Sequence, residues 1–187
     1  MALQNAGDIV VDVERATAFR LVENPQRMAE CIPGCHDLRE LGPGRFAAVL
    51  TNKVSFMTLS FKVIVEVVNM DAPNGIEARI TGEPIGLVGR LAANASLKFT
   101  DAGEKCTLIH YSADVGLTGK LGGIGQPVFR AKSARLAKEF ADNLKAAIES
   151  LDKGQPGPAN PVQPVSATAE SVGEKTATAG DGREVLP

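Results

Sequence analysis

The sequence has no tryptophan, one tyrosine and 2 histidines among 187 residues, so side chains suited to acid–base catalysis and to aromatic stacking are scarce. It also has 3 cysteines, an odd number, and no apolar run of membrane-spanning length or signal-peptide form. This usage favours a cytoplasmic, reducing compartment over a disulfide-stabilised secreted protein. The net charge of -2 disfavours nucleic-acid binding, which needs a clearly basic surface.

One long amphipathic segment follows a glycine-rich stretch. Between Gln126 and Leu151, apolar side chains recur at helical spacing and basic side chains fall mostly between them. Pro127 suits the first turn of a helix, where a missing N–H is tolerated, so the helix is predicted to begin near Gln126. At ~1.5 Å per residue its length is about 39 Å, enough to lie across a small sheet. The predicted apolar face consists of Phe129, Leu136, Phe140, Leu144, Ala147 and Leu151.

Strand-like alternation fills most of the chain before this helix. Gly7 to Val13 alternates and is predicted to form a first strand, and two short helices follow, the second capped by Asn24. Six further strands are predicted between Asp37 and Val115. The predicted fold class is therefore α+β, a seven-stranded antiparallel sheet curved around the long C-terminal helix, with two short helices between the first two strands.

The turns of this predicted meander are of two kinds. Those at 41–44, 71–75 and 101–104 are polar, whereas those at 55–59, 84–87 and 117–121, and the earlier segment 31–35, are largely apolar. Successive turns of an antiparallel meander alternate between the two ends of the sheet, so one end is predicted to be apolar. We call this end the rim and predict that it contacts a membrane or a protein partner. Its predicted members are Ile32, Pro33, Phe56, Met57, Ile85, Leu87, Leu121, Ile124, Lys120 and Arg130.

Positive charge accompanies the rim. No acidic residue occurs from Val115 to Lys138, although five basic residues do. This local excess suits an anionic partner or lipid headgroups, and the alternative is an ordinary solvated helix face.

The period of two also identifies the side chains that face the helix. Many of them are alanine, so the interior between sheet and helix is predicted to contain an apolar cavity; a fully packed core of small residues is the alternative. The predicted lining consists of Phe61, Val63, Val65, Ala78, Ile80, Leu91, Ala93, Ala95, Tyr111, Ala113, Phe129, Leu136 and Phe140.

Few residues are candidates for chemistry. His110 is predicted to point outward, and His36 lies with Cys31 and Cys35 in a segment whose spacing matches no zinc signature. The sequence has no phosphate loop, dinucleotide fingerprint or nucleophile elbow. The carboxylates of the central strands share the outward register, namely Glu66, Glu77 and Asp114. The pattern therefore predicts ligand binding, with no catalytic residue and no metal.

The composition changes after Leu151. Residues 152–187 are rich in Gly, Pro, Ala, Ser and Thr and contain almost no bulky apolar residues. Such a segment cannot bury enough apolar surface to fold, so a disordered tail is predicted to follow a single domain at residues 1–151.

Several short motifs resemble those of one family. They are Asn24-Pro25, Cys31-Ile32-Pro33-Gly34-Cys35, Gly119-Lys120-Leu121 with Gly125, and Ala137-Lys138-Glu139-Phe140. With the element order, they resemble the G-subunit family of carbon monoxide dehydrogenase, within the START and polyketide-cyclase (SRPBCC) superfamily of helix-grip folds, over roughly Ala2 to Leu151. The resemblance implies a non-enzymatic accessory protein of a molybdenum hydroxylase of the carbon monoxide dehydrogenase type, acting in maturation or in placing the enzyme at the membrane.

The leading hypothesis combines these features. A cytoplasmic protein, peripheral on the inner face of the membrane, would hold a quinone or lipid in the cavity and meet a membrane, the hydroxylase or its maturation factors through the rim. No covalent or motif-defined cofactor is expected. Two alternatives stay open: a cyclase or hydrolase of the same superfamily, with His36, Asp114 or Tyr111 as acid or base, and a protein-binding module with a solid core.

Overall fold

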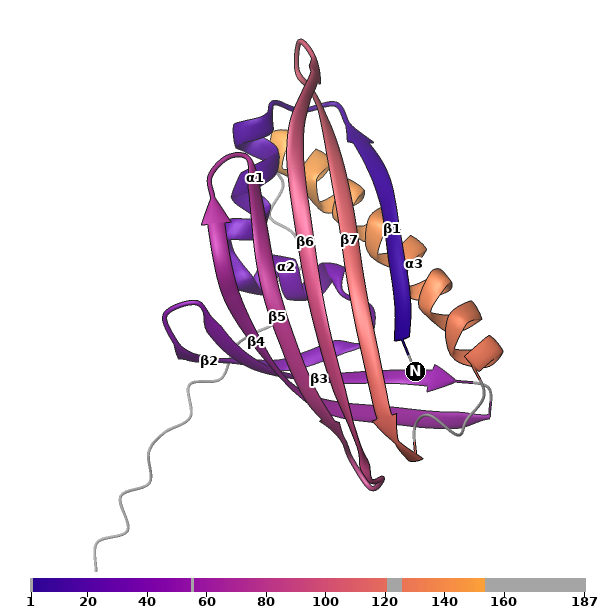
Figure 1. Cartoon of the computed structure of the whole chain (residues 1–187). Helices are drawn as coiled ribbons and strands as arrows, with labels where there is room; N and C mark the ends of the chain where they lie inside the picture. Colours follow the sequence, from indigo (N-terminus) through magenta and orange to yellow (C-terminus); the bar gives the residue numbers. More distant parts are fainter. Residues whose placement is uncertain (1, 55, 121–125, 154–187) are drawn as a thin grey trace, which may run out of the picture.

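The computed structural model describes residues 2–54, 56–120 and 126–153, which form one sheet and three helices (Figure 1). The strands are β1 (Ala2–Val11), β2 (Cys35–Gly42), β3 (Arg45–Val54), β4 (Met57–Asp71), β5 (Gly75–Pro84), β6 (Gly89–Gly103) and β7 (Cys106–Gly119). The helices are α1 (Arg15–Glu23), α2 (Pro25–Cys31) and α3 (Gln126–Asp152).

The sheet is an antiparallel meander with one displaced strand. Its order is β1-β7-β6-β5-β4-β3-β2, so β2 to β7 follow one another and β1 joins the far edge beside β7. The helices lie on one side of this curved sheet (Figure 1). The predicted fold class, a seven-stranded antiparallel sheet with a long C-terminal helix and two short helices after the first strand, is confirmed.

The predicted first strand is displaced in the structure. β1 begins at Ala2 and ends at Val11, whereas alternation had placed it at Gly7 to Val13. Asn5 and Gly7 interrupt the apolar alternation, so sequence alone missed the first half of the strand. Val13 is still buried beyond the strand end, and its carbonyl accepts a hydrogen bond of 2.7 Å from the Thr107 hydroxyl.

Local sequence determines where the helix α2 begins and where it ends. The Asn24 side chain accepts hydrogen bonds from the backbone N–H groups of Gln26 and Arg27, and Pro25 occupies the first position of α2, as predicted. After Cys31 the chain leaves the helix and reaches Gly34, which has a φ of +77° and whose carbonyl accepts from the Thr51 N–H at 2.8 Å. The loop between α2 and β2 is thereby fixed onto β3.

The long helix begins at Gln126, as its pattern predicts, and packs against β1, α1, α2 and, near its start, β3. Leu144 and Ile148 on its inner side are fully buried. Three ion pairs at i, i+4 spacing lie on its outer side: Arg135 with Glu139, Lys138 with Asp142, and Lys145 with Glu149. Such exposed pairs add little to stability, because solvent screens their charges. Among the helices of the described residues, none has the length and apolarity needed to cross a bilayer.

The buried apolar residues form two separate clusters. One lies beneath α1, α2 and the end of α3, and we call it the helix cluster; the other lies between the rim and the start of α3, and we call it the rim cluster. The helix cluster contains Ile9, Val11, Val13, Ala18, Phe19, Leu21, Val22, Cys31, Leu97, Phe99, Ile109, Leu144 and Ile148. The rim cluster contains Leu3, Ala48, Val54, Leu59, Phe61, Val63, Leu117 and Phe129.

Candidate ligand site

A row of small and apolar side chains crosses the concave face between the two clusters. Cross-strand pairing aligns Phe46 with Val65, Ala78 with Ala95, and Ala95 with Ala113, which in turn pairs with Asn5 on β1. Val67 and Ile80 connect the β4 and β5 parts of this row, since Val65 pairs with Ile80 and Val67 with Ala78. The row therefore spans the sheet from β3 to β1. We call it the central row.

The central row is less buried than its position suggests. Phe46, Val65, Ala78, Ala95 and Ala113 are all half-buried, and none of them belongs to either cluster. Leu136 of α3 is likewise half-buried and outside both clusters. Interior residues of a close-packed protein are normally covered by their neighbours. The middle of the concave face is thus partly open to solvent and is not covered by either cluster.

The predicted cavity lining divides between the row and the clusters. Phe61, Val63 and Phe129 are buried members of the rim cluster, and Ile80 and Leu91 pack against it. Tyr111 and Phe140 pack against the helix cluster, and Ala93 is buried. The strand residues among them are buried or half-buried. The remaining predicted residues are Val65, Ala78, Ala95 and Ala113 of the central row, and Leu136 of α3.

Tyr111 brings the one phenol of the chain to the concave face. Its ring meets Phe140 of α3 edge to face, with the ring centroids 6.0 Å apart. It also lies over Gly7, its partner on β1, where an added Cβ would come within 2.5 Å of the phenol oxygen. Within the described part of the chain this hydroxyl has no hydrogen-bond partner, so it is available to a bound molecule.

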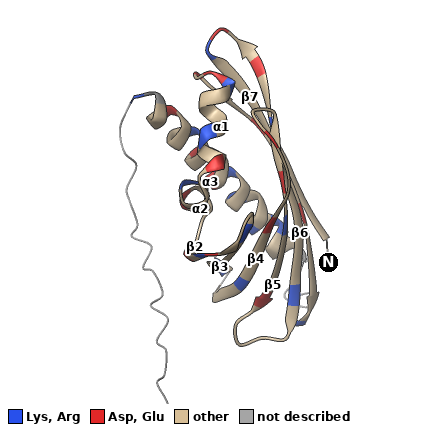
Figure 2. Ribbon diagram, turned by 90° about the vertical axis from the view of Figure 1, so that its left-hand side faces the viewer, with Lys and Arg blue, Asp and Glu red and all other residues tan. Residues whose placement is uncertain are grey.

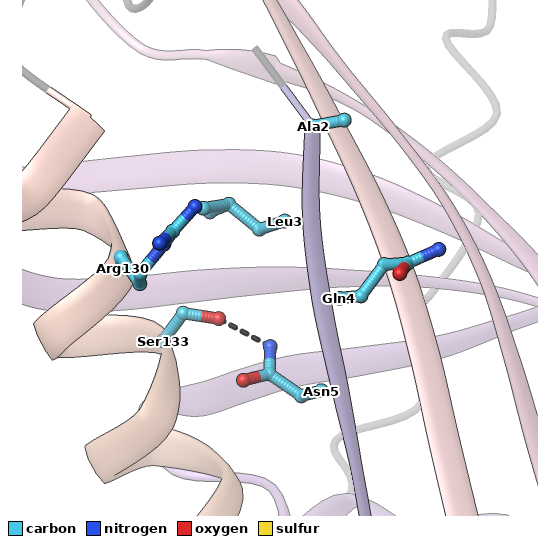
Figure 3. Close-up of a pocket in the computed structure, with 6 residues that line it drawn as sticks. All are labelled: Ala2, Leu3, Gln4, Asn5, Arg130 and Ser133. Atoms are coloured by element: carbon cyan, nitrogen blue, oxygen red, sulfur yellow. Dashed lines mark hydrogen bonds between the residues drawn. The ribbon is translucent and has the colours of Figure 1, made fainter.

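A cavity of about 300 Å³ lies at the β1 end of the row (Figure 3). Arg130 and Ser133 reach it from α3, and Leu3 and Asn5 point toward them from β1 (Figure 3). The Asn5 side-chain amide donates a hydrogen bond to the Ser133 hydroxyl, which ties the strand to the helix. Sequence reasoning missed this pair because the two residues lie 128 positions apart.

A second cavity, of about 470 Å³, lies at the β3 end of the row. Its apolar lining residues are Pro25, Leu38 and Phe46, and its polar lining residues are Arg20, Glu23, Asn24, Gln26 and Glu40. It therefore separates the α1–α2 junction from the β2–β3 hairpin. No pattern in the sequence pointed to it, because its residues come from four elements.

The rim carries several exposed apolar side chains. Phe56 is 86% exposed and Val88 72% exposed, and Ile85, Leu87 and Val128 are also exposed. Lys120 and Arg130 are also exposed, and the Lys120 N–H donates to the Val88 carbonyl at 3.0 Å. Val88 was not among the predicted rim residues. Ile32, Pro33 and Met57 were predicted rim residues, but they are half-buried rather than exposed, and Met57 packs against the rim cluster. Leu121 and Ile124 lie outside the described residues.

Exposed apolar residues also occur at the opposite end of the sheet, which corrects the prediction of a single apolar end. Leu41, Val68 and Met70 lie near the polar turns and are each about half exposed. The register of β4 shifts between Val67 and Asn69, and this bulge leaves Val68 as an extra residue without a place in the core.

The histidines lie on the outer surface of the sheet. His110 is exposed, as predicted, and its Nδ1 lies 2.7 Å from the Asp8 carboxylate. His36 contacts the Asp37 carboxylate through Nδ1 and the Thr51 hydroxyl through Nε2, at 2.9 and 3.0 Å. Among the described residues no group of three potential metal ligands comes together.

The carboxylates assigned to the outward register do not reach the interior. Glu77 and Asp114 are exposed, and Glu66 forms an ion pair with Arg45 at 3.3 Å. Among its described residues, the central row contains no carboxylate or imidazole. The arrangement suits a neutral apolar molecule better than acid–base chemistry on a charged one.

Cys31 should be the least reactive thiol of the folded protein. Burial, and secondarily the nearby Glu30 carboxylate, raise its pKa from 9.0 to about 11, and its Sγ donates to the Arg27 carbonyl. Because the thiolate is the reactive form, this shift lowers the reactive population at pH 8 by about 100-fold. Timed iodoacetamide labelling with peptide mass spectrometry should show Cys31 alkylated about 100-fold more slowly in the native than in the denatured chain. Equal rates would contradict the buried position.

A curved seven-stranded antiparallel sheet, with two short helices after its first strand and a long C-terminal helix on its concave side, defines a helix-grip protein of the START-like class. The sequence model for the G-subunit of carbon monoxide dehydrogenase (CoxG) matches residues 7–149. The chain therefore belongs to the CoxG family. Among curated protein sequences, none matches it.

Solved structures share this fold at low sequence identity. A conserved protein from Geobacillus kaustophilus is 22% identical, with a TM-score of 0.70, covering 79% of this chain and 95% of its own. The ZhuI aromatase/cyclase from Streptomyces sp. R1128 is 12% identical, with a TM-score of 0.57, covering 82% and 95%. A START superfamily protein from Mycobacterium smegmatis is 13% identical, with a TM-score of 0.55, covering 81% and 99%.

Proposed function

We propose that this protein is a non-enzymatic accessory factor of a molybdenum hydroxylase of the carbon monoxide dehydrogenase type, which binds an apolar molecule such as a quinone or a lipid. The central row carries this proposal: half-buried apolar side chains cross the concave face between two packed clusters. An apolar ligand would cover these side chains, and each Å² of apolar surface removed from water contributes about 25 cal/mol. A quinone suits this role because the partner hydroxylase must pass its electrons on to an acceptor.

The rim is the second part of the proposal. Phe56 and Val88 are too exposed to contribute to folding. Lys120, which is bonded to Val88 through its backbone, and Arg130 are exposed and have no ion pairs among the described residues. Apolar side chains flanked by cations are typical of surfaces that meet anionic lipid headgroups or an acidic protein partner. The proposed location is the cytoplasm, peripheral on the inner face of the membrane.

The rim is tested by Phe56→Asp combined with Val88→Asp. Both side chains are solvent-exposed, so the fold should be unaffected, while cosedimentation with vesicles containing anionic lipid and binding to the hydroxylase should fall at least tenfold. Leu41→Asp is the matched control, because Leu41 is 53% exposed at the opposite end of the sheet. Unchanged binding in the double variant, or an equal loss in the control, would show that the rim is not the contact surface.

A second candidate function is catalysis of the cyclase or hydrolase type. The observation in its favour is the Tyr111 hydroxyl, which lies on the concave face without a partner among the described residues, and fold relatives include aromatase/cyclases. His36 and Asp114, the other candidates, lie on the outer surface. A single phenol lacks the paired acid and base that most such reactions use. The binding function is therefore the better supported of the two.

A further inference from the structure

The two cavities lie at opposite ends of the central row. Phe46 lines the larger cavity and begins the row on β3, and Asn5 lines the smaller cavity and ends the row on β1. From β3 to β1 the row crosses five strand spacings of about 4.8 Å, or about 24 Å in all. One leaflet of a bilayer's hydrocarbon is only about 15 Å thick. The row is therefore long enough for a single lipid-length chain with its head group.

The two ends differ in how they are closed. At the β1 end the Asn5–Ser133 hydrogen bond joins β1 to α3, so strand and helix are held together there. At the β3 end, Arg20 and Glu23 on α1 and Glu40 on β2 line the larger cavity, and no ion pair or hydrogen bond among the described residues connects them across it. In Figure 2 the helices α1 and α2 stand opposite the strands, with β2 and β3 below them. The β3 end is the more open of the two.

The rim does not give a ligand a direct path to the central row. The rim cluster lies between the apolar turns and the central row, and its members Val54, Leu59 and Phe129 are each less than a tenth exposed. A ligand passing from the rim to the row would have to separate this packed layer. The larger cavity shares a wall residue with the row and requires no such separation.

We infer that an elongated amphipathic ligand lies crosswise on the sheet, along the central row, and is taken up between the α1–α2 junction and the β2–β3 hairpin. Its apolar chain points toward β1, and its head group lies among Arg20, Gln26 and Glu40. The cavity holds two carboxylates, Glu23 and Glu40, and one guanidinium, Arg20, so a negatively charged phosphate is disfavoured there. The same groups can form hydrogen bonds with a neutral head group, because Arg20 donates to a carbonyl or hydroxyl oxygen and the carboxylates accept from a hydroxyl. This inference rests on the proposed ligand binding.

Stopped-flow uptake of a pyrene-labelled long-chain alcohol by the full-length protein tests the route. Leu38→Trp, which narrows the larger cavity, should slow uptake at least tenfold. Leu41→Trp is the matched control, because Leu41 lies on the same strand but outside the cavity and is exposed. It should leave the rate unchanged. Phe56→Asp is measured alongside to detect entry through the rim. Phe46→Ala, which widens the cavity, should accelerate uptake and decides the question if Leu38→Trp fails to fold.

The outcomes separate this inference from the function on which it rests. Slow uptake in Phe56→Asp with normal rates in Leu38→Trp and Phe46→Ala would place the route at the rim and overturn the inference while preserving ligand binding. Equal rates in all variants would also overturn the inferred route and leave ligand binding intact, without placing the route at the rim. A wild-type protein that gives no fluorescence change with the probe would overturn the ligand binding itself, and the route with it.

Discussion

Replacing Gly34 with alanine should lower the free energy of unfolding by about 3 kcal/mol or more. Gly34 has a φ of +77°, which an L-residue adopts only with strain, and an added Cβ would lie 2.1 Å from the backbone carbonyl oxygen of Thr51. Because that oxygen belongs to the backbone of β3, the loop between α2 and β2 would have to lift off the sheet. Equilibrium unfolding in urea measures the loss.

Gly86 provides the matched control for this substitution. Its φ of +79° is nearly the same, but nothing lies within 4 Å of its added Cβ. Gly86→Ala should therefore cost only the conformational strain, about 1 kcal/mol. Equal costs at the two positions would mean that the close approach to Thr51 does not constrain Gly34. The same result would leave the Cys-Ile-Pro-Gly-Cys motif without its structural explanation.

Ala95→Phe should be tolerated by the fold but should strongly weaken ligand binding. Ala95 lies in the middle of the central row, half-buried between Ala78 and Ala113, so a phenyl ring would occupy space that the two clusters leave open. The free energy of unfolding should change by less than about 0.5 kcal/mol, whereas overpacking a closed core costs about 1–3 kcal/mol. Binding of the pyrene-labelled alcohol should fall at least tenfold.

Ala48→Phe is the matched control, because it makes the same substitution within a packed cluster. Ala48 is a buried member of the rim cluster, and the larger ring should destabilise the protein by the full 1–3 kcal/mol or so. If Ala95→Phe is equally destabilising, the central row is a packed core of small residues. The alternative that the sequence left open, a protein-binding module with a solid interior, would then be preferred.

Local patterns in the sequence were sufficient for the elements and their faces. Asn24 and Pro25 mark the start of α2, Pro127 marks the first turn of α3, and the period of two places Val65 and Tyr111 on the concave face. Each of these features depends on neighbours within a few residues, which is the range over which propensity and periodicity act. The same reasoning failed at Asn5 and Gly7, whose places in β1 are set by pairing with β7 more than 100 residues away.

The candidate site was predictable only in part. Alanines on the inward register indicated that the concave face lacks bulky side chains. Ala78, Ala95 and Ala113 could therefore be predicted as lining residues. The division of the core into two clusters, and the cavities at either end of the row, follow from the positions of α1 and α3 on the sheet, and no local pattern encodes these. The bulge at Val68 is likewise a product of pairing, so sequence reasoning could not foresee the exposed residues at the polar end.

Native mass spectrometry of the freshly purified protein, followed by organic extraction, tests the central claim most directly. The claim is that the space along the central row holds one apolar molecule. It predicts a stoichiometric adduct that is released by organic solvent, identified as a quinone or lipid, and absent from Ala95→Phe. A bare polypeptide mass that stays unchanged after incubation with quinones and membrane lipids would contradict it.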